Sequence, residues 1–275
     1  MDLYQLIINQ AANALDEDVG SGDISAELID AETCLDTELL VREDAILCGC
    51  QWFDEVFRQC DERINIQWHA QDGDRLNANT VVCEVSGPAR GLLTAERSAL
   101  NFLQTLSGTA TLTRSYVDKI KHTDCKILDT RKTIPQLRFG QKYAVVCGGG
   151  SNHRIGLFDA FLIKENHLAA SGSIAKTVAR ARQMHPEKLL EVEIENLAQL
   201  QQAIDAGVDR SLLDNFSIAE TKQAVELNKG RIELEASGNI DLESVVEIAT
   251  TGVNYVSIGS LTKNLRAIDF SLRYR

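Results

Sequence analysis

Cationic side chains gather between residues 129 and 167, although the chain as a whole is acidic, with 28 lysines and arginines against 40 aspartates and glutamates. This segment has only three carboxylates for six lysines and arginines, which are Arg131, Lys132, Arg138, Lys142, Arg154 and Lys164. Such a cluster in an anionic protein concentrates the electrostatic field on a small anionic ligand. The glycines at 148–150 allow backbone N–H groups to approach the same ligand closely. The sequence therefore predicts an anion-binding site; the alternative is a solvated basic surface beside a glycine loop.

The cations have the chemistry of a cage for a small anion. Arginine grips a carboxylate through two parallel N–H bonds, whereas lysine acts as a point charge. Several cations around one ligand indicate a dicarboxylate or a phosphate. The expected members of the cage are Arg131, Lys132, Arg154 and Lys164, with Arg97 and His153 as further candidates.

Two acidic side chains end consecutive strand-like runs and form a candidate metal site. Glu193 lies in the run 188–196, and Asp214 lies in the run 210–216. Carboxylates in such places can hold Mg²⁺, which commonly connects one or two protein carboxylates with substrate phosphates. The alternative is that the pair only neutralises the cationic cage.

Two turns of small residues follow the last two strand-like runs. They consist of Ser237, Gly238 and Asn239, and of Ile258, Gly259 and Ser260. On neighbouring late strands of a β/α barrel, such turns suit a phosphate site. The residues together indicate a site for two anionic ligands, one of them phosphorylated and bound to magnesium, without naming the substrate.

The elements that must position these side chains alternate between apolar runs and helical runs. Near-continuous apolar strands between helices indicate buried parallel strands. Helix caps are expected at Ser173 and at the pair Ser217 and Glu220. The apolar runs cover 125–131, 159–166, 188–196, 210–216, 231–239 and 254–260.

Polar residues recur where these apolar runs end. Their spacings of 33, 29, 21, 23 and 22 residues each suit one βα unit, and the residues are Arg131, Lys164, Glu193, Asp214, Ser237 and Gly259. Polar groups at the carboxyl ends of strands are what the active face of a β/α barrel requires. Only about 155 residues are available here, against ~250 for a full eight-fold barrel, so we expect a small or incomplete one.

The first hundred residues have a different pattern. The runs 36–49 and 79–87 predict short antiparallel strands, and a helix is expected from about Thr94 until Gly108 breaks it. The tail 267–275 alternates apolar and polar residues, which is typical of a half-exposed antiparallel strand. We therefore expect an N-terminal domain of residues 1–108, completed by the tail 264–275, and a catalytic domain of residues 109–263.

Composition excludes several classes of protein. The acidic balance, with a pI near 4.9, argues against nucleic acid or an anionic membrane as the main partner. The sequence contains no run of 18 apolar residues, so it predicts no membrane span. The acidic N-terminal segment does not resemble a secretory signal. Seven scattered cysteines favour free thiols in a reducing cytoplasm.

A series of phrases resembles one known family. In chain order these are EDVGSGDIS, ERSALNFLQTLSG, ILDTRKTIPQLR, QKYAV, CGGGSNHRIGLFDAFLIKENH, EVEIENLAQLQQA, LLDNF, LEASGNI and SIGSLTK. They are similar to the quinolinate phosphoribosyltransferases, the carboxylating nicotinate-nucleotide diphosphorylases, over nearly the whole chain. One departure is Gln136, where the family usually has glycine after proline, so that the loop beside Arg138 could be stiffened or moved.

The resemblance implies a fold and an activity. The fold would be an α/β protein in which an N-terminal open-faced α/β sandwich domain precedes an incomplete parallel β/α barrel. It would assemble at least as a homodimer with shared active sites, with a higher oligomer also open. The enzyme would transfer phosphoribosyl from phosphoribosyl pyrophosphate to quinolinate with decarboxylation. The products would be nicotinate mononucleotide, CO₂ and pyrophosphate, in de novo NAD biosynthesis, with Mg²⁺ as cofactor.

The resemblance also implies roles for the candidate residues. Lys132 would lie near the pyrophosphate and the reacting centre, Glu193 and Asp214 would serve ribose and Mg²⁺, and Arg97 would enter the neighbouring subunit's site. The 5-phosphate would be held by the turns Ser237–Asn239 and Ile258–Ser260. The two quinolinate carboxylates would be held by Arg131, His153, Arg154 and Lys164.

Three alternatives stay open at this level. One is a paralogous phosphoribosyltransferase that acts on another aromatic acid. The second is a barrel lyase that forms a Schiff base through Lys164 or Lys132. The third is a non-catalytic anion-binding module, which would leave Glu193 and Asp214 without a purpose.

Overall fold

The computed structural model describes residues 3–275 and divides the chain into two compact units. The first unit holds the described residues up to Leu112 together with Ile134–Gly149 and Asn264–Arg275. The second unit consists of Thr113–Thr133 and Gly150–Lys263. The chain therefore returns to the first unit twice, and the segment 134–149 belongs to it although its neighbours in sequence do not.

The first unit is built on an antiparallel sheet with the strand order β12-β1-β5-β3. These strands are β1 (Cys34–Val41), β3 (Asn65–Trp68), β5 (Thr80–Pro88) and β12 (Phe270–Tyr274). A second, two-stranded sheet pairs β2 (Ala45–Ile46) with β4 (Arg75–Leu76). The helices are α1 (Leu3–Val19), the 3₁₀ helix η1 (Ala26–Leu28), α2 (Cys50–Cys60), α3 (Ala89–Ile120) and α4 (Arg138–Cys147), and the residues of α3 from Thr113 on belong to the second unit.

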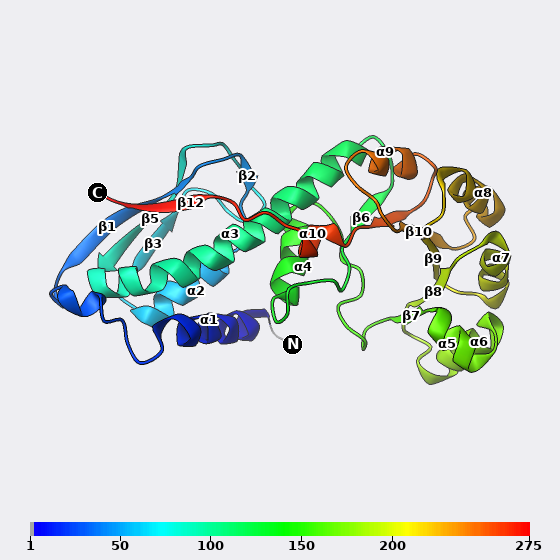
Figure 1. Cartoon of the computed structure of the whole chain (residues 1–275), viewed down its shortest axis with the longest axis horizontal. Helices are drawn as coiled ribbons and strands as arrows, with labels where there is room; N and C mark the ends of the chain where they lie inside the picture. Colours follow the sequence, from blue (N-terminus) through cyan, green and yellow to red (C-terminus); the bar gives the residue numbers. More distant parts are fainter. Residues whose placement is uncertain (1–2) are drawn as a thin grey trace. The chain divides into compact units, whose positions relative to one another are not determined.

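One hydrophobic core joins the sheet to three helices. Buried side chains of α1, α2 and α3 pack with the inward-facing residues of the strands, for example Phe53 and Leu103 with Val85. Figure 1 shows these helices beside the sheet at the blue and cyan end of the chain. A sheet covered by helices on one face is the open-faced sandwich that the family resemblance implies.

The C-terminal tail forms the edge strand of this sheet. Strand β12 pairs with β1 in antiparallel register, with Leu272 opposite Leu39 and Phe270 opposite Val41. Phe270 and Leu272 are buried, whereas Tyr274 is exposed at the end of the strand. The alternation in the tail thus predicted both the strand and its return to the N-terminal elements.

Helix α3 does not break at Gly108, and this expectation from the sequence was wrong. The helix continues unbroken for 32 residues, from Ala89 to Ile120. A side chain at Gly108 would overlap the carbonyl oxygen of Arg266, in the tail that runs past this helix. The glycine therefore serves a close backbone approach and is no helix terminator, because a single glycine inside a long helix costs only about 1 kcal/mol.

The second unit is an open parallel barrel. Its single sheet has the strand order β6-β11-β10-β9-β8-β7, and all neighbouring strands run parallel. Because β6 and β7 are the two edges of this sheet, the barrel is incomplete, as the length of the segment predicts. The strands are β6 (Lys126–Leu128), β7 (Phe161–Ile163), β8 (Leu190–Ile194), β9 (Arg210–Asp214), β10 (Glu233–Ser237) and β11 (Tyr255–Ser257).

Helices connect these strands and cover their outer side. Helices α6, α7 and α8 lie in a row against one another (Figure 1). Ser173 caps α6, and Ser217 forms a capping box with Glu220 on α8, both as predicted. The helices are α5 (Glu165–Ser171), α6 (Ile174–Met184), α7 (Leu197–Ala206), α8 (Ile218–Asn228), α9 (Ser244–Ala249) and α10 (Ser260–Lys263). None of the helices within residues 3–275 combines the length and the hydropathy needed to cross a membrane.

Candidate active site

A cavity of about 320 Å³ opens at the carboxyl ends of the barrel strands, and every residue that lines it belongs to the second unit. Eight of the side chains predicted from the sequence line this cavity, which we call the barrel pocket: Arg131, Lys132, His153, Arg154, Lys164, Glu193, Asp214 and Ser237. The rest of its lining consists of Thr130, Leu162, Leu212, Glu235 and Ser257. The fold thus brings together cations and carboxylates that are up to 104 residues apart, as the span from Arg131 to Glu235 shows.

The parallel register places Glu193 and Asp214 on the same face of the sheet. Glu193 lies opposite Leu212 of β9, and Asp214 is two residues further along that strand. Because side chains alternate between the two faces of a strand, positions two residues apart point the same way. Both carboxylates therefore face the barrel pocket, which supplies two hard oxygen donors suited to Mg²⁺.

Lys164 is directed into the pocket by its place between β7 and α5. Its backbone is in the extended conformation at the N-cap of α5, where its N–H donates to Nδ1 of His167 over 3.0 Å. Its ammonium group forms an ion pair with the Glu193 carboxylate. The cation cage and the acidic pair are therefore in direct contact, and the Lys164–Glu193 pair marks their boundary.

Lys132 is held by the loop that follows β6. Its N–H donates to the hydroxyl of Thr130 over 3.1 Å, and its carbonyl accepts a hydrogen bond from the hydroxyl of Thr262 over 2.8 Å. A Cβ atom at Gly259 would lie 3.0 Å from Cδ of Lys132. Glycine at position 259 therefore leaves space for the aliphatic part of the Lys132 side chain, so the turn after β11 packs against Lys132.

His153 is fixed from three directions. Its backbone N–H donates to the buried carboxylate of Asp129 over 3.0 Å, and its Nδ1 accepts the N–H of Arg154 over 2.7 Å. Because Nδ1 is an acceptor, the donor of a neutral ring is Nε2. Nε2 lies 2.9 Å from a carboxylate oxygen of Glu191 and 3.5 Å from one of Glu235.

Glu191 and Glu235 form an acidic floor beneath the pocket. Burial raises the pKa of Glu191 to about 7, and burial together with the charge of Glu191 raises the pKa of Glu235 to about 8. Two like charges in a buried space cannot both ionise easily, so protons remain on this pair near neutral pH. Neither residue was predicted from the sequence, although Glu191 is two positions before Glu193 and Glu235 two before Ser237, which puts each on the pocket face of its strand.

A further ion-pair layer lies along the same strands. The Arg210 guanidinium binds the Glu233 carboxylate over 2.9 Å and approaches Glu235 at 3.4 Å. The same guanidinium lies 4.0 Å from the centre of the Tyr255 ring, whose hydroxyl donates to Glu233. This layer closes the barrel interior on the side of the strands' amino ends and leaves the pocket open at their carboxyl ends.

Arg154 and Arg131 supply the positive charge of the cage. The pKa of Arg154 is lowered, first by burial and then by the nearby charge of Arg131. Asp159 shapes the loop after Arg154 by accepting the N–H groups of Ile155 and Gly156. Two neighbouring guanidinium groups repel each other unless an anion lies between them, so this arrangement favours a bound carboxylate or phosphate.

Some predicted residues are not part of the pocket lining. They are Gly238, Asn239, Ile258, Gly259 and Ser260 of the two turns, and Arg97. A side chain at Gly238, whose φ is +108°, would overlap the Asn215 side chain, so this turn requires glycine. The Ile258 side chain is buried in the core, and its backbone N–H donates to the carbonyl of Leu128 over 2.9 Å, so neither group is available to an anionic ligand.

Three of the cations that the sequence singles out lie in the first unit. Arg138 and Lys142 are on α4, where Lys142 is buried, so the basic segment of the sequence is divided between the two units. Arg97 is on α3 with an exposed side chain. Within residues 3–275 its guanidinium has no hydrogen-bond or ion-pair partner, unlike most arginines of the chain.

A larger cavity of about 550 Å³ lies wholly in the first unit, but the two arginines that line it already have partners within the protein. Arg63 pairs with Asp61 over 2.7 Å, and the guanidinium of Arg90 donates to the carbonyl of Ile29. The barrel pocket, with several cations and two facing carboxylates, is therefore the candidate active site.

The chain is similar to known proteins over its whole length. The chain matches the family models "Quinolinate phosphoribosyl transferase, N-terminal domain" over residues 23–107 and "C-terminal domain" over residues 109–273. It is 42% identical to a probable carboxylating nicotinate-nucleotide pyrophosphorylase of Bacillus subtilis over 257 residues, which are 93% of this chain and 89% of that protein. It is 41% identical to the carboxylating nicotinate-nucleotide pyrophosphorylase of Mycobacterium leprae over 94% of each chain. The solved structure of the nicotinate-nucleotide pyrophosphorylase from Francisella tularensis superposes with a TM-score of 0.96 at 46% identity, covering 100% of this chain and 98% of that one.

Proposed function

The chain belongs to the quinolinate phosphoribosyltransferase family, and from this we infer that it transfers phosphoribosyl from phosphoribosyl pyrophosphate to quinolinate in NAD biosynthesis. Quinolinate loses CO₂ in the reaction, and nicotinate mononucleotide and pyrophosphate are released. The observation that carries this inference is the barrel pocket, where a cage for carboxylates adjoins two acidic groups suited to a metal-bound pyrophosphate. In an anion-binding module without catalysis, the acidic pair Glu193 and Asp214 would have no role.

The quinolinate subsite is formed by the cations on the Arg131 side of the pocket. The guanidinium groups of Arg131 and Arg154 match planar carboxylates, and Lys164 adds a point charge from the opposite edge strand. His153 completes the subsite, because the floor acid Glu191 holds its ring at the pocket wall. These residues bind a dicarboxylate in one orientation, with its ring nitrogen directed toward the second substrate.

The phosphoribosyl subsite uses the acidic pair and Lys132. The donor set fits Mg²⁺, because Glu193 and Asp214 offer hard oxygens on one face of the sheet. Mg²⁺ held by Glu193 and Asp214 would neutralise charge on the leaving pyrophosphate. Lys132 adds a second positive charge beside it, while the two carboxylates stabilise the positive charge that develops on the ribose carbon. The 5-phosphate is held by the turns Ser237–Asn239 and Ile258–Ser260, where Gly238 and Gly259 let the backbone come close to it.

Positioning accounts for much of the rate. The pyridine nitrogen attacks the ribose carbon as pyrophosphate leaves, and the cage holds the two reactants in line. Correctly aligned reactants can gain ~7–11 kcal/mol relative to reactants free in solution. The resulting pyridinium ring withdraws electrons, so the carboxylate next to its nitrogen can leave as CO₂.

We propose that the enzyme is a homodimer in which Arg97 reaches the partner's barrel pocket. Its guanidinium is exposed and unpaired within residues 3–275, and burying an arginine without a partner is costly. The anionic ligands of a neighbouring pocket would supply that partner.

All seven cysteines are free thiols, which agrees with a reducing cytoplasm as the compartment of the enzyme.

The function is tested in two steps with purified protein. Calorimetry should detect quinolinate binding, and nicotinate mononucleotide should form when phosphoribosyl pyrophosphate and Mg²⁺ are added. Tight binding of another aromatic acid instead of quinolinate would identify the paralogous transferase. Borohydride trapping of substrate on Lys164 or Lys132, without release of pyrophosphate, would identify the Schiff-base lyase; the ion pair of Lys164 with Glu193 disfavours that chemistry.

A further inference from the structure

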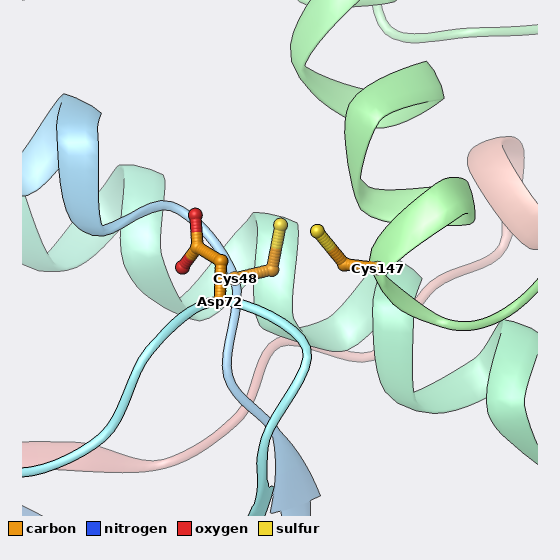
Figure 2. A group of neighbouring side chains, drawn as sticks. All are labelled: Cys48, Asp72 and Cys147. Atoms are coloured by element: carbon orange, nitrogen blue, oxygen red, sulfur yellow. The ribbon is translucent and has the colours of Figure 1, made fainter.

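Two cysteines and an aspartate that the proposed reaction does not use meet in the first unit. Cys48 lies between β2 and α2, Asp72 lies between β3 and β4, and Cys147 is the last residue of α4. Their sulfur and carboxylate atoms all lie within 4.8 Å of one another (Figure 2). Residues from three distant parts of the chain therefore converge on one spot.

Asp72 is committed to holding the local backbone, so it is a poor metal ligand. One of its carboxylate oxygens accepts the N–H groups of Gly49 over 2.9 Å and of Cys50 over 3.1 Å. The other accepts the hydroxyl of Tyr143 over 2.9 Å. A metal ion would have to compete with these three donors, which leaves the two sulfurs as the reactive part of the cluster.

The two sulfurs are placed for reaction with each other. Figure 2 shows the sulfur atoms of Cys48 and Cys147 next to each other, carried by two different segments of the chain. Cys48 is held in place by Ser107, whose hydroxyl accepts its N–H over 3.0 Å and donates to its carbonyl over 3.1 Å. Cys48 is fully buried, whereas Cys147 is partly exposed at the helix end.

The surroundings make the two thiols unequal. Burial raises the pKa of Cys48, while a hydrogen bond from the Cys48 thiol lowers the pKa of Cys147. By contrast, burial raises the pKa values of Cys60, Cys83 and Cys125. A reactive cysteine needs thiolate character, access and a resolving cysteine nearby, and within residues 3–275 Cys147 meets all three conditions.

We propose that Cys147 and Cys48 form an oxidation site at which a hydroperoxide is reduced and a disulfide is made. The thiolate of Cys147 attacks one peroxide oxygen; the O–O bond breaks, and a sulfenic acid and hydroxide are formed from hydrogen peroxide. The sulfur of Cys48 then attacks the sulfenic sulfur, the S–S bond forms, and the S–O bond breaks. The hydroxyl group leaves with the Cys48 proton as water, so two thiols lose two electrons and one peroxide becomes two waters.

The disulfide would tie the end of α4 to the segment that leads into α2. It would close a loop of about 100 residues, and in the chain-entropy model the stabilisation by a cross-link grows with loop length. Residue 147 also directly precedes the glycines 148–150, after which the chain continues to His153 and Arg154. Oxidation would thus restrain the chain just ahead of two pocket residues, whatever reaction the pocket catalyses.

The test uses the full-length reduced protein in a buffer with a chelator. One equivalent of hydrogen peroxide should lower the intact mass by about 2 Da and reduce the free thiols from seven to about five. Peptide mapping should find the Cys48–Cys147 link, and dithiothreitol should reverse both changes. A first disulfide between any other pair, or no disulfide after all peroxide is consumed, would overturn the proposal.

Variants separate the two roles. Cys48→Ala should stop at a sulfenic acid on residue 147, which dimedone traps, because the resolving thiol is absent. Cys147→Ser should abolish disulfide formation, whereas Cys50→Ser, a neighbour of the pair, should retain it. If Cys48→Ala does not fold, the comparison of Cys147→Ser with Cys50→Ser decides alone: equal disulfide yield in these two would contradict the assignment.

Discussion

The Nε2 atom of His153 lies 2.9 Å from a carboxylate oxygen of Glu191, a fully buried residue beneath the pocket. The imidazole is thereby anchored from below while its neighbour Arg154 lines the open side. Glu191 and Glu235 thus hold the His153 ring in position when no ligand is bound. The floor also makes the protein's stability depend on pH.

Stability should fall as the pH rises through neutrality. Burial raises the pKa of Glu235 from 4.5 to about 8, so the folded state binds this proton more tightly than the unfolded chain does. The free energy of unfolding should therefore decrease between about pH 4.5 and pH 8, and become level above that range, with a total change of a few kcal/mol. Urea unfolding at several pH values, in the presence of a chelator, measures this slope. Glu235→Gln should flatten it, whereas the exposed control Glu226→Gln should not; a steep slope retained in Glu235→Gln would refute the explanation.

Removing the acidic pair should remove the response to magnesium. The double variant Glu193→Gln, Asp214→Asn keeps the shape of both side chains but loses their charge, so kcat should fall by about 10²-fold or more. Activity measured against Mg²⁺ concentration should no longer rise. The matched control is Glu195→Gln, an exposed carboxylate just beyond the same strand, which should behave as the wild type. Unchanged magnesium dependence in the double variant would assign the metal to other residues.

Arg154→Ala should weaken quinolinate binding by about 2–5 kcal/mol, since it leaves a desolvated carboxylate without its cation. Isothermal titration with quinolinate alone measures this loss directly. Arg180→Ala, which removes an exposed arginine of α6, should leave the affinity unchanged. Equal affinities of Arg154→Ala and the wild type would exclude Arg154 from the subsite.

Two inactive variants should restore activity when they are mixed. In a mixed dimer of Arg97→Ala with Lys164→Ala, one shared site carries both substitutions and the other carries neither. With full exchange about half of the dimers are mixed, so about a quarter of all sites become active. Mixing Arg154→Ala with Lys164→Ala is the control, because both residues line the same pocket and no intact site can form. Activity that stays absent despite proven subunit exchange would mean that Arg97 does not act across subunits.

Replacing Gln136 with glycine should give a more stable protein than replacing it with alanine. Its φ of +63° lies in the left-handed region, which costs an L-residue about 1–2 kcal/mol and glycine almost nothing. The hydrogen bond from Gln10 goes to the backbone carbonyl of residue 136 and survives both changes. Gln136→Gly should therefore be more stable to urea than Gln136→Ala by about 1 kcal/mol, after the entropy cost of glycine in the unfolded chain. Equal stabilities would show that the loop relaxes and stores no strain.

Much of the fold and of the site follows from the sequence, because the signals are local. The apolar runs between helical runs predicted parallel strands. The polar residues where these runs end predicted that the pocket lies at the carboxyl ends of the strands. The alternation of the tail likewise predicted strand β12. Each of these signals lies within about ten residues, since a strand's faces and a helix's caps are set by neighbouring side chains. The pocket residues Arg131, Glu193 and Asp214 were found in this way.

Only the tertiary structure decided what depends on segments that are distant in sequence. Gly108 looked like a helix terminator until the tail was found against α3. Burial of Glu191 beneath His153 requires the strands to be assembled, and only then do protons stay on this acid near neutral pH. The meeting of Cys48 with Cys147 likewise needs two segments about 100 residues apart to pack. Dielectric surroundings and contacts between such segments are properties of the packed chain, so no local pattern of residues encodes them.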